Sequence, residues 1–234
     1  MGTYVIAVGG SLIVPEEINV TFLHAFKQLI LKRVEKGDKF ILVAGGGKIA
    51  RKYRDAAAEV GEIDNEEKDW LGIHCTRLNA HLLRTIFKQD AFPRIFKSFD
   101  DPLNAFKEPI LIGAGMKPGR SSDFPAVFLA KRFGASHVIN LSNIEYVYSE
   151  DPRLNPEAEK FDSISWQKYL DIIGTRWDPG MSAPFDPIAS KEAMENGIKV
   201  AMVHGSKLSN LEKFFDGNSN FGGTLIGVEE DRVN

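Results

Sequence analysis

Short apolar runs alternate along the chain with longer segments in which apolar residues recur every three or four positions. Runs rich in β-branched residues predict buried strands, and the three- and four-residue spacing predicts amphipathic helices. We expect strands at 3–8, 39–43, 109–112, 136–141, 198–203 and 223–228. We expect helices at 19–36, 48–60, 66–88 and 122–133. Two segments rich in Pro, Gly and Asp are predicted to be surface loops: 150–162 and 174–186.

This alternation indicates the α/β class. Strands separated by helices predict a mostly parallel central sheet with helices on both faces, an αβα sandwich. The chain has 234 residues, and 43% of them are apolar, which is enough to fill one large core. We therefore expect a single domain over 1–234, with approximate lobes at 1–135 and 136–234.

Composition narrows the classes of function. The net charge is -3 and the basic residues are dispersed, which argues against a nucleic-acid partner. Cys75 is the only cysteine, so no intramolecular disulfide or CxxC site can form, and the histidines lack HExxH spacing, so no metal-ligating site is predicted. No run approaches the roughly 18 apolar residues of a membrane span, and MGTYVIAVGG lacks the basic start of a signal peptide. We expect a cytoplasmic protein without a membrane partner.

The helix expected at 48–60 has an unusual charge distribution. Four cations lie within its first two turns, namely Lys48, Arg51, Lys52 and Arg54. The first turn of a helix already carries about half a positive charge, so acidic residues are normally favoured there. The pattern predicts that an anion is held at this end of the helix.

Three of the expected strands lead into glycine-rich turns, at 9–11 (GGS), 45–48 (GGGK) and 113–123 (GAGMKPGRSSD). Ligands of open parallel sheets gather beyond the carboxyl ends of the strands. Glycines there allow backbone N–H groups to approach a phosphate closely. Any one of these turns is explained equally well as a tight turn, but three at one edge, two of them with cations, favour a phosphate site. The chain contains neither the GxGxxG fingerprint nor a P-loop.

Several longer segments carry a family resemblance. They are GGS at 9–11, GGGKIARKY at 45–53, DWLGIHCTRLNAHLL at 69–83, PGRSSD at 118–123, SNIEYVYSEDPR at 142–153 and FDPIASK at 185–191. In this order they resemble the amino-acid-kinase superfamily, and within it the archaeal-type uridylate (UMP) kinases. The resemblance implies transfer of the γ-phosphoryl group of ATP to UMP, giving UDP and ADP, with Mg²⁺ as cofactor. It also implies a homo-oligomer, a hexamer in the family.

The same resemblance implies roles for individual residues. The catalytic residues implied are Lys48, Arg51, Asp186 and Lys191. The ATP-binding residues implied are Gly9, Gly10, Ser11, Gly46, Ser142, Asn143, Tyr148 and Asp151. The UMP-binding residues implied are Gly45, Asp69, Gly115, Lys117, Gly119, Arg120, Ser121, Ser122 and Asp123.

Some of these residues have a simpler explanation beside the implied one. The resemblance implies that Asp69 binds the ribose hydroxyls of UMP, although an acidic residue on the solvated first turn of a helix needs no ligand to explain it. Capping of the following helix would account for Ser121, Ser122 and Asp123. For Arg77 and Asn79 we predict packing and hydrogen bonds between lobes rather than substrate contact.

The chain departs from the family pattern at two places. Many relatives have a lysine where this chain has Ala7, so Lys48 or Lys191 must supply the catalytic cation. The segment usually written TNxDGVY is SNIEYVY here, with Glu145 for the acid and Tyr146 for the glycine. A tyrosine does not readily adopt positive φ, so we expect this turn to differ. These departures keep two alternatives open, a catalytically impaired nucleotide- or oxyanion-binding protein and a kinase for another small phosphate acceptor.

Overall fold

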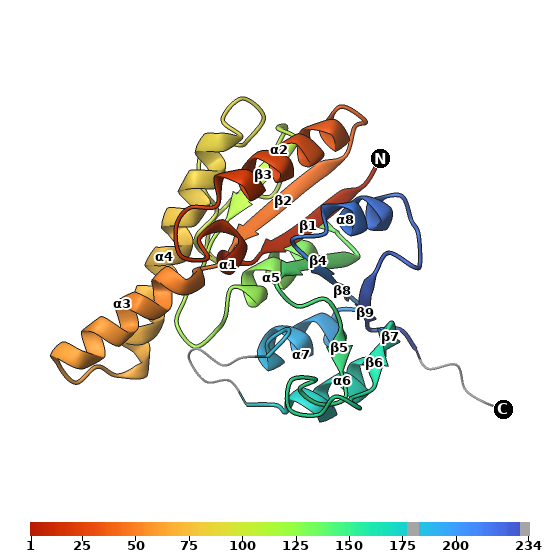
Figure 1. The fold of residues 1–234 in the computed structure, drawn as a ribbon. Coiled ribbons are helices and arrows are strands. Elements are labelled where there is room, and N and C mark those ends of the chain that lie inside the picture. Colours follow the sequence, from red (N-terminus) through yellow and green to blue (C-terminus); the bar gives the residue numbers. More distant parts are fainter. Residues whose placement is uncertain (177–182, 230–234) are drawn as a thin grey trace.

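A seven-stranded sheet forms the centre of the molecule (Figure 1). The computed structural model describes residues 1–176 and 183–229. In spatial order the strands are β3 (Ile110–Gly113), β2 (Lys39–Ala44), β1 (Thr3–Val8), β4 (His137–Ser142), β8 (Lys199–His204), β9 (Gly223–Ile226) and β7 (Ser163–Ile164). Neighbouring strands are parallel except β8 and β9, which are antiparallel. The predicted mostly parallel α/β sheet is confirmed.

Helices cover both faces of this sheet, and each face has its own core. Alternate residues of β1 point to opposite faces, so Val5 belongs to one cluster and Ile6 to the other. Both are fully buried, as expected for a parallel strand covered on two sides. One cluster includes residues of α5 (Asp123–Phe133), α6 (Trp166–Ile173) and α7 (Pro187–Glu195). The other includes residues of α2 (Val20–Val34), α4 (Asn65–Ile86) and α8 (Leu208–Phe215).

One helical hairpin extends beyond the sheet. The helix α3 (Gly47–Val60) follows β2 and contacts the first half of α4, and Figure 1 shows the pair projecting from the body of the molecule. Only Ala50 of α3 is buried. The short α1 (Gly10–Ile13) lies at the base of this hairpin, in contact with α3. Most of the α3 surface is therefore exposed and takes no part in core packing.

The predicted elements are present with boundaries shifted by a few residues. The helix expected at 66–88 is α4, and the one expected at 122–133 is α5. Four helices were not predicted: α1, α6, α7 and α8. The short strands β5 (Val147–Tyr148), β6 (Lys160–Phe161) and β7 were not predicted either. All of the missed helices are nine residues or shorter, which is too short for a periodic apolar pattern to establish itself.

The prediction of a surface loop at 174–186 is wrong at its C-terminal end. Residues 177–182 lie outside the described residues, but Phe185 is 0% exposed and Asp186 is 2% exposed. The backbone of Phe185 forms two hydrogen bonds with the hydroxyl of Tyr169, which accepts from the amide at 2.8 Å and donates to the carbonyl at 2.9 Å. The loop expected at 150–162 is exposed over most of its length, and its end pairs with β5 through β6.

The sheet is continuous across residue 135, where the two lobes were expected to meet. β1 pairs directly with β4, and α5 contacts strands from both sides of this position. The division into acceptor and donor lobes therefore stays a prediction about binding, and the sheet itself has no break there. Among the described residues, no helix is both long enough and apolar enough to span a membrane.

Candidate functional site

The turns after β1 and β2 pack backbone against backbone. A Cβ on Gly10 would lie 2.0 Å from the Gly47 nitrogen, and one on Gly45 would lie 2.6 Å from the Gly10 nitrogen. Gly47 also has φ +70°, which side chains rarely adopt. Close packing of the two turns is therefore sufficient to require glycine at these three positions. Evidence for a phosphate site has to come from the residues around them.

A cavity of about 170 Å³ lies beside these turns, between α3, α4 and the loop that follows β3. The residues of each helix that line it recur at three- and four-residue spacing, so each helix presents one face to it. The lining residues are Gly46, Gly47, Ala50, Arg51, Arg54, Asp69, Gly72, Ile73, Thr76, Gly115, Arg120, Ser121 and Ser122. Five of the predicted UMP-binding residues are among them: Asp69, Gly115, Arg120, Ser121 and Ser122.

Hydrogen bonds from α4 hold the loop that follows β3. Thr76 accepts from the amide of Gly115 through its Oγ1 at 2.8 Å, and Asp69 accepts from the amide of Gly119 through Oδ2 at 2.6 Å. Arg77 Nε donates to the carbonyl of Gly115 at 3.3 Å. Gly119 has φ +81°, so glycine suits this turn. One oxygen of Asp69 is thus used to position the loop.

Arg77 and Asn79 form hydrogen bonds as predicted, but their partners lie within the predicted lobe 1–135, so the expectation that they join the two lobes is wrong. Asn79 Nδ2 donates to the carbonyl of Gly45 at 2.8 Å, which ties α4 to the turn after β2. The guanidinium of Arg77 also lies 5.8 Å from the ring centroid of Trp70. These side chains join the loops that surround the cavity.

Arg120 is held by aromatic rings. Its guanidinium carbon lies 3.9 Å from the ring centroid of Phe124 and 5.3 Å from that of Phe99. Such cation–π contacts restrict an arginine without neutralising its charge. The capping expected of the next two serines is only partly present. Ser122 is the N-cap of α5 but forms no capping bond, whereas Ser121 Oγ accepts from the amide of Asp123 at 2.9 Å.

Two carboxyl groups meet where this loop reaches α7. The amide of Asp186 donates to Asp123 Oδ2 at 3.1 Å, and the hydroxyl of Ser121 donates to Asp186. Asp186 Oδ1 also caps α7, accepting from the amides of Ile188 and Ala189. Burial, together with the neighbouring Asp186 carboxyl, raises the pKa of Asp123 to about 7. Burial raises the pKa of Asp186 as well.

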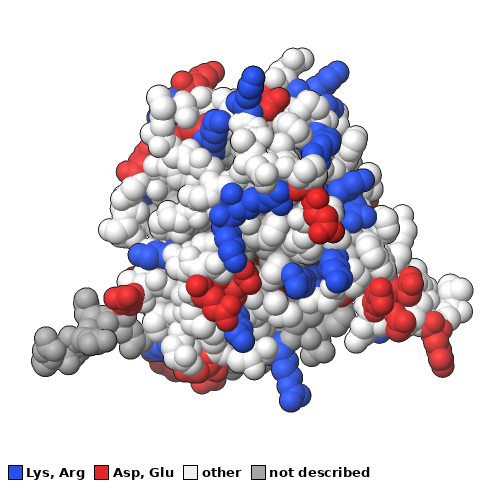
Figure 2. All heavy atoms as spheres, turned by 180° about the vertical axis from the view of Figure 1, so that it is seen from behind, with Lys and Arg blue, Asp and Glu red and all other residues white. Residues whose placement is uncertain are grey.

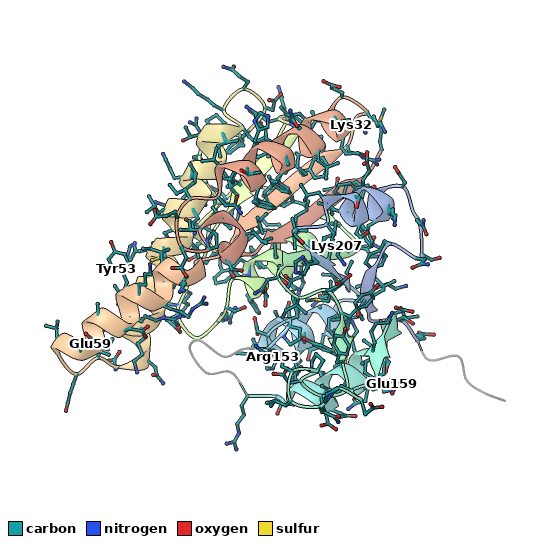
Figure 3. All side chains as sticks on the ribbon, viewed as in Figure 1. Lys32, Tyr53, Glu59, Arg153, Glu159 and Lys207 are labelled. Carbon is teal, nitrogen blue, oxygen red and sulfur yellow. The ribbon has the colours of Figure 1, made fainter. Side chains whose placement is uncertain are left out.

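The predicted ATP-binding residues lie outside the cavity, except Gly46. The amide of Gly9 donates to the carbonyl of Leu141 at 2.7 Å, and this bond holds Gly9 against the next residue, Ser142. Tyr148 is in the β5–β6 ribbon. Asp151 accepts a hydrogen bond from Arg153 at 2.6 Å, which lowers the pKa of Asp151 to about 2; Arg153 is labelled in Figure 3. Of this group, the fold brings Gly9, Gly10 and Ser142 together.

The predicted lysines do not line the cavity either. Lys48 forms a hydrogen-bonded ion pair with Glu16, and Lys52 Nζ lies 3.4 Å from the same carboxylate. Lys191 has a side chain that is 70% exposed, and its Nζ lies 4.0 Å from Glu195, one turn along α7. Lys117 is exposed as well.

Both unusual residues in the segment after β4 have partners. Lys207, which is labelled in Figure 3, donates through Nζ to Glu145 at 2.5 Å, and Lys160 Nζ lies 4.3 Å from the ring centroid of Tyr146. Positive φ occurs only at glycines among the described residues, so Tyr146 adopts an ordinary backbone conformation. The expectation that this turn differs from a glycine-containing one is consistent with that geometry.

Sequence reasoning counted Arg54 among the cations of this helix but gave it no binding role, and it missed Thr76. Both could have been found from helical periodicity. Arg54 follows Arg51 by three positions, and Thr76 follows Asp69 by seven, so each pair shares a helix face.

Comparisons with known proteins agree with this geometry. The sequence profile of the Amino acid kinase family matches residues 2–204. The chain belongs to the amino acid kinase family. The family resemblance inferred from the sequence is thereby confirmed.

Relatives in this family cover nearly the whole chain. A uridylate kinase of Pyrococcus abyssi is 34% identical over 198 residues, which are 84% of this chain and 87% of the relative. A uridylate kinase of Methanospirillum hungatei is 33% identical over 228 residues, which are 97% of this chain and 95% of the relative. The crystal structure of uridylate kinase from Archaeoglobus fulgidus is similar with a TM-score of 0.73 at 26% identity, covering 97% of this chain and 100% of that one.

The family fold also occurs with other acceptors. The crystal structure of an aspartate kinase from Synechocystis is similar with a TM-score of 0.72 at 19% identity, covering 99% of this chain and 40% of that one. This likeness concerns the fold alone. Since one fold serves several acceptors, the acceptor has to be inferred from the residues of the cavity.

Proposed function

We propose that this protein is an ATP-dependent uridylate kinase, which transfers the γ-phosphoryl group of ATP to UMP and releases UDP and ADP. One observation carries the proposal, the cavity between α3, α4 and the loop after β3, lined by Arg51, Arg54, Arg120 and Asp69. Uridylate kinases that are 30% or more identical over most of the chain support the same acceptor.

Phosphoryl transfer needs positioning and positive charge more than covalent help from the protein. A phosphate monoester is largely a dianion at pH 7. Arg51 lines the cavity from α3 and Arg120 from the loop after β3, and the planar forks of their guanidinium groups suit phosphate oxygens. Asp69 has an oxygen that is not used by the Gly119 amide and is available to a ribose hydroxyl. These features support binding of a nucleoside monophosphate here.

ATP is proposed to bind along the neighbouring strand ends, at the turns of Gly9, Gly10 and Ser11 and on the segment from Ser142 to Asp151. The contact of Gly9 with the backbone of Ser142 supports a common surface for these two segments. Asp186 links this side to the acceptor loop through Ser121, which supports its proposed catalytic role. Lys48 contributes to catalysis in this proposal only after it exchanges Glu16 for a phosphate.

Mg²⁺ is proposed to enter with ATP. The described residues contain no group of three His, Cys, Asp or Glu side chains able to hold a metal ion. Phosphate oxygens commonly supply ligands to Mg²⁺, with one or two carboxylates and several waters. The phosphates of the bound nucleotide can therefore provide most of the coordination.

We also propose a homo-oligomer, with small-molecule nucleotides as the remaining partners. Leu78 on α4 is 70% exposed, an apolar side chain available to a subunit contact. Figure 2 shows both signs of charge across the face it displays, a distribution that does not single out a polyanion-binding surface there. Light scattering coupled to size-exclusion chromatography measures the oligomeric state directly.

One observation favours a second candidate, a nucleotide-binding protein with impaired catalysis. The family resemblance implies a lysine where this chain has Ala7, and both Lys48 and Lys191 form ion pairs outside the cavity. Turnover with ATP and a panel of nucleoside monophosphates separates the candidates. We expect UMP to be phosphorylated far faster than AMP or GMP. Tight UMP binding without turnover supports the second candidate, and equal rates with purines exclude a uridylate kinase.

A further inference from the structure

The basic residues of α3 lie on two sides of the helix, and the two sides have different surroundings. Lys48 and Lys52 both contact Glu16, outside the cavity. Arg51 and Arg54, three residues apart, line the cavity together with Ala50. Residues at this spacing are neighbours on one helix face, with Cβ atoms roughly 5–6 Å apart. The two lysines are therefore paired with a carboxylate of the protein, whereas the two arginines line the cavity.

Arg54 is held in place without being neutralised. Its side chain is less exposed than that of Arg51, and its Nε donates to the carbonyl of Ala50 at 3.3 Å. It also lies near α4, where burial raises the pKa of Cys75 and the Arg54 charge opposes that rise. Within the part of the chain that the structure describes, no ion pair joins Arg51, Arg54 or Arg120 to a carboxylate.

The charge balance of the cavity matches the proposed acceptor. Three arginines and one aspartate line it, which leaves a net charge of +2 before any ligand binds. A phosphate monoester carries close to two negative charges at pH 7. A nucleoside without phosphate offers nothing to compensate three arginines.

We propose that Arg54 is a second phosphate-binding arginine of the acceptor site, which acts with Arg51 to select a phosphate dianion. The inference rests on the proposed function and adds a specificity-determining residue to it. Two planar forks on adjacent turns of one helix can contact different oxygens of the same phosphate. Because both arginines are on α3, the spacing of their Cα atoms is set before the ligand arrives.

This role has a consequence in pH. The second proton of a phosphate monoester dissociates at a pKa of about 6. Below that pH the ligand is a monoanion, and the second arginine loses part of its attraction. UMP affinity should therefore fall as pH decreases from 7.5 to 5.5, and the fall should be smaller when Arg54 is replaced. The Asp123 carboxyl also titrates in this range, with a pKa of about 7, but it does so in wild type and variant alike, so the difference between the two slopes reports on Arg54.

The experiment is calorimetric titration of UMP and uridine into the full chain and three variants. Arg54→Gln removes the charge, and Arg54→Lys keeps the charge but removes the fork. Lys52→Gln is the matched control, because it removes a cation from the same helix on the side that faces Glu16. We expect Arg54→Gln to weaken UMP binding about 10- to 100-fold, which is the usual effect of losing a hydrogen bond to a charged group. Arg54→Lys should lose less, and Lys52→Gln should stay within about twofold, since exposed ion pairs contribute little.

Titration with uridine, which lacks the phosphate, distinguishes a loss of phosphate recognition from a general disturbance of the fold. Uridine affinity should be unchanged in Arg54→Gln, and the pH slope of UMP binding should flatten. Equal weakening of UMP and uridine, or UMP affinity equal to that of Lys52→Gln, overturns the role of Arg54. If the wild-type chain phosphorylates UMP but the variant binds it normally, only this inference fails. If the wild-type chain neither binds nor phosphorylates UMP, the proposed function fails, and the role of Arg54 fails with it.

Discussion

The Asp123 carboxyl provides a prediction that links folding to the site. Its pKa is raised to about 7 by burial and by the adjacent Asp186 carboxyl, whereas an unfolded aspartate has a pKa of about 3.9. A group whose pKa is raised by folding stabilises the folded state fully below the unfolded pKa. That stabilisation is lost as pH rises through the folded pKa. Asp123 should therefore stabilise the fold at pH 5 and hardly at all at pH 8.

The size of the effect follows from the two pKa values. Proton linkage with values of about 3.9 and 7 gives about 2.7 kcal/mol at pH 5 and almost nothing at pH 8. The residue is only partly buried by surface area and titrates together with Asp186, so the full figure is a ceiling. We expect about half of it, roughly 1–1.5 kcal/mol. Asp123→Asn cannot ionise, and its oxygen can still accept from the amide of Asp186.

The assay is urea unfolding of wild type and Asp123→Asn at pH 5 and pH 8. From pH 5 to pH 8, the free energy of unfolding of Asp123→Asn should rise by about 1–1.5 kcal/mol relative to that of wild type, because only wild type loses the stabilisation from Asp123. Asp55→Asn on the exposed side of α3 is the matched control and should follow wild type at both. If the difference between wild type and Asp123→Asn is the same at both pH values, the carboxyl titrates normally and the reasoning is refuted.

Three further predictions concern the proposed reaction. Asp69→Asn should raise the KM for UMP with little change in kcat, because a ribose contact is made in ground and transition states alike; steady-state kinetics check this, and a large fall in kcat at unchanged KM contradicts it. Tyr148→Ala should weaken ATP binding and leave UMP affinity nearly unchanged in titrations of each nucleotide; an unaltered ATP affinity removes Tyr148 from the donor site. Lys48→Ala should lower kcat about 10²- to 10³-fold if this lysine contacts the transferred phosphoryl group. Wild-type turnover in Lys48→Ala together with an inactive Lys191→Ala assigns that role to Lys191.

The sequence was sufficient for the long elements and for the edge of the sheet where the site forms. Parallel strands that end in glycine turns must bring those turns to one edge, whatever the side chains do. The buried end of the predicted loop at 174–186 could not be foreseen, since Pro, Gly and Asp mark turns on the surface and beneath it alike. Asp186 there is an N-cap followed by a proline, a local helix signal that the short apolar pattern of α7 did not strengthen.

Which cations face the ligand was harder to predict than the presence of a ligand site. Charge alone made Lys48, Arg51, Lys52 and Arg54 equivalent, and all four predicted an anion at the start of α3. The fold separates them, because Glu16, far from them in sequence, neutralises the two lysines, while helical spacing turns the two arginines toward the cavity. A dipole and a cluster of like charges thus require anionic compensation without specifying its source. In this protein Glu16 compensates the two lysines, so only the charges of the two arginines indicate a ligand.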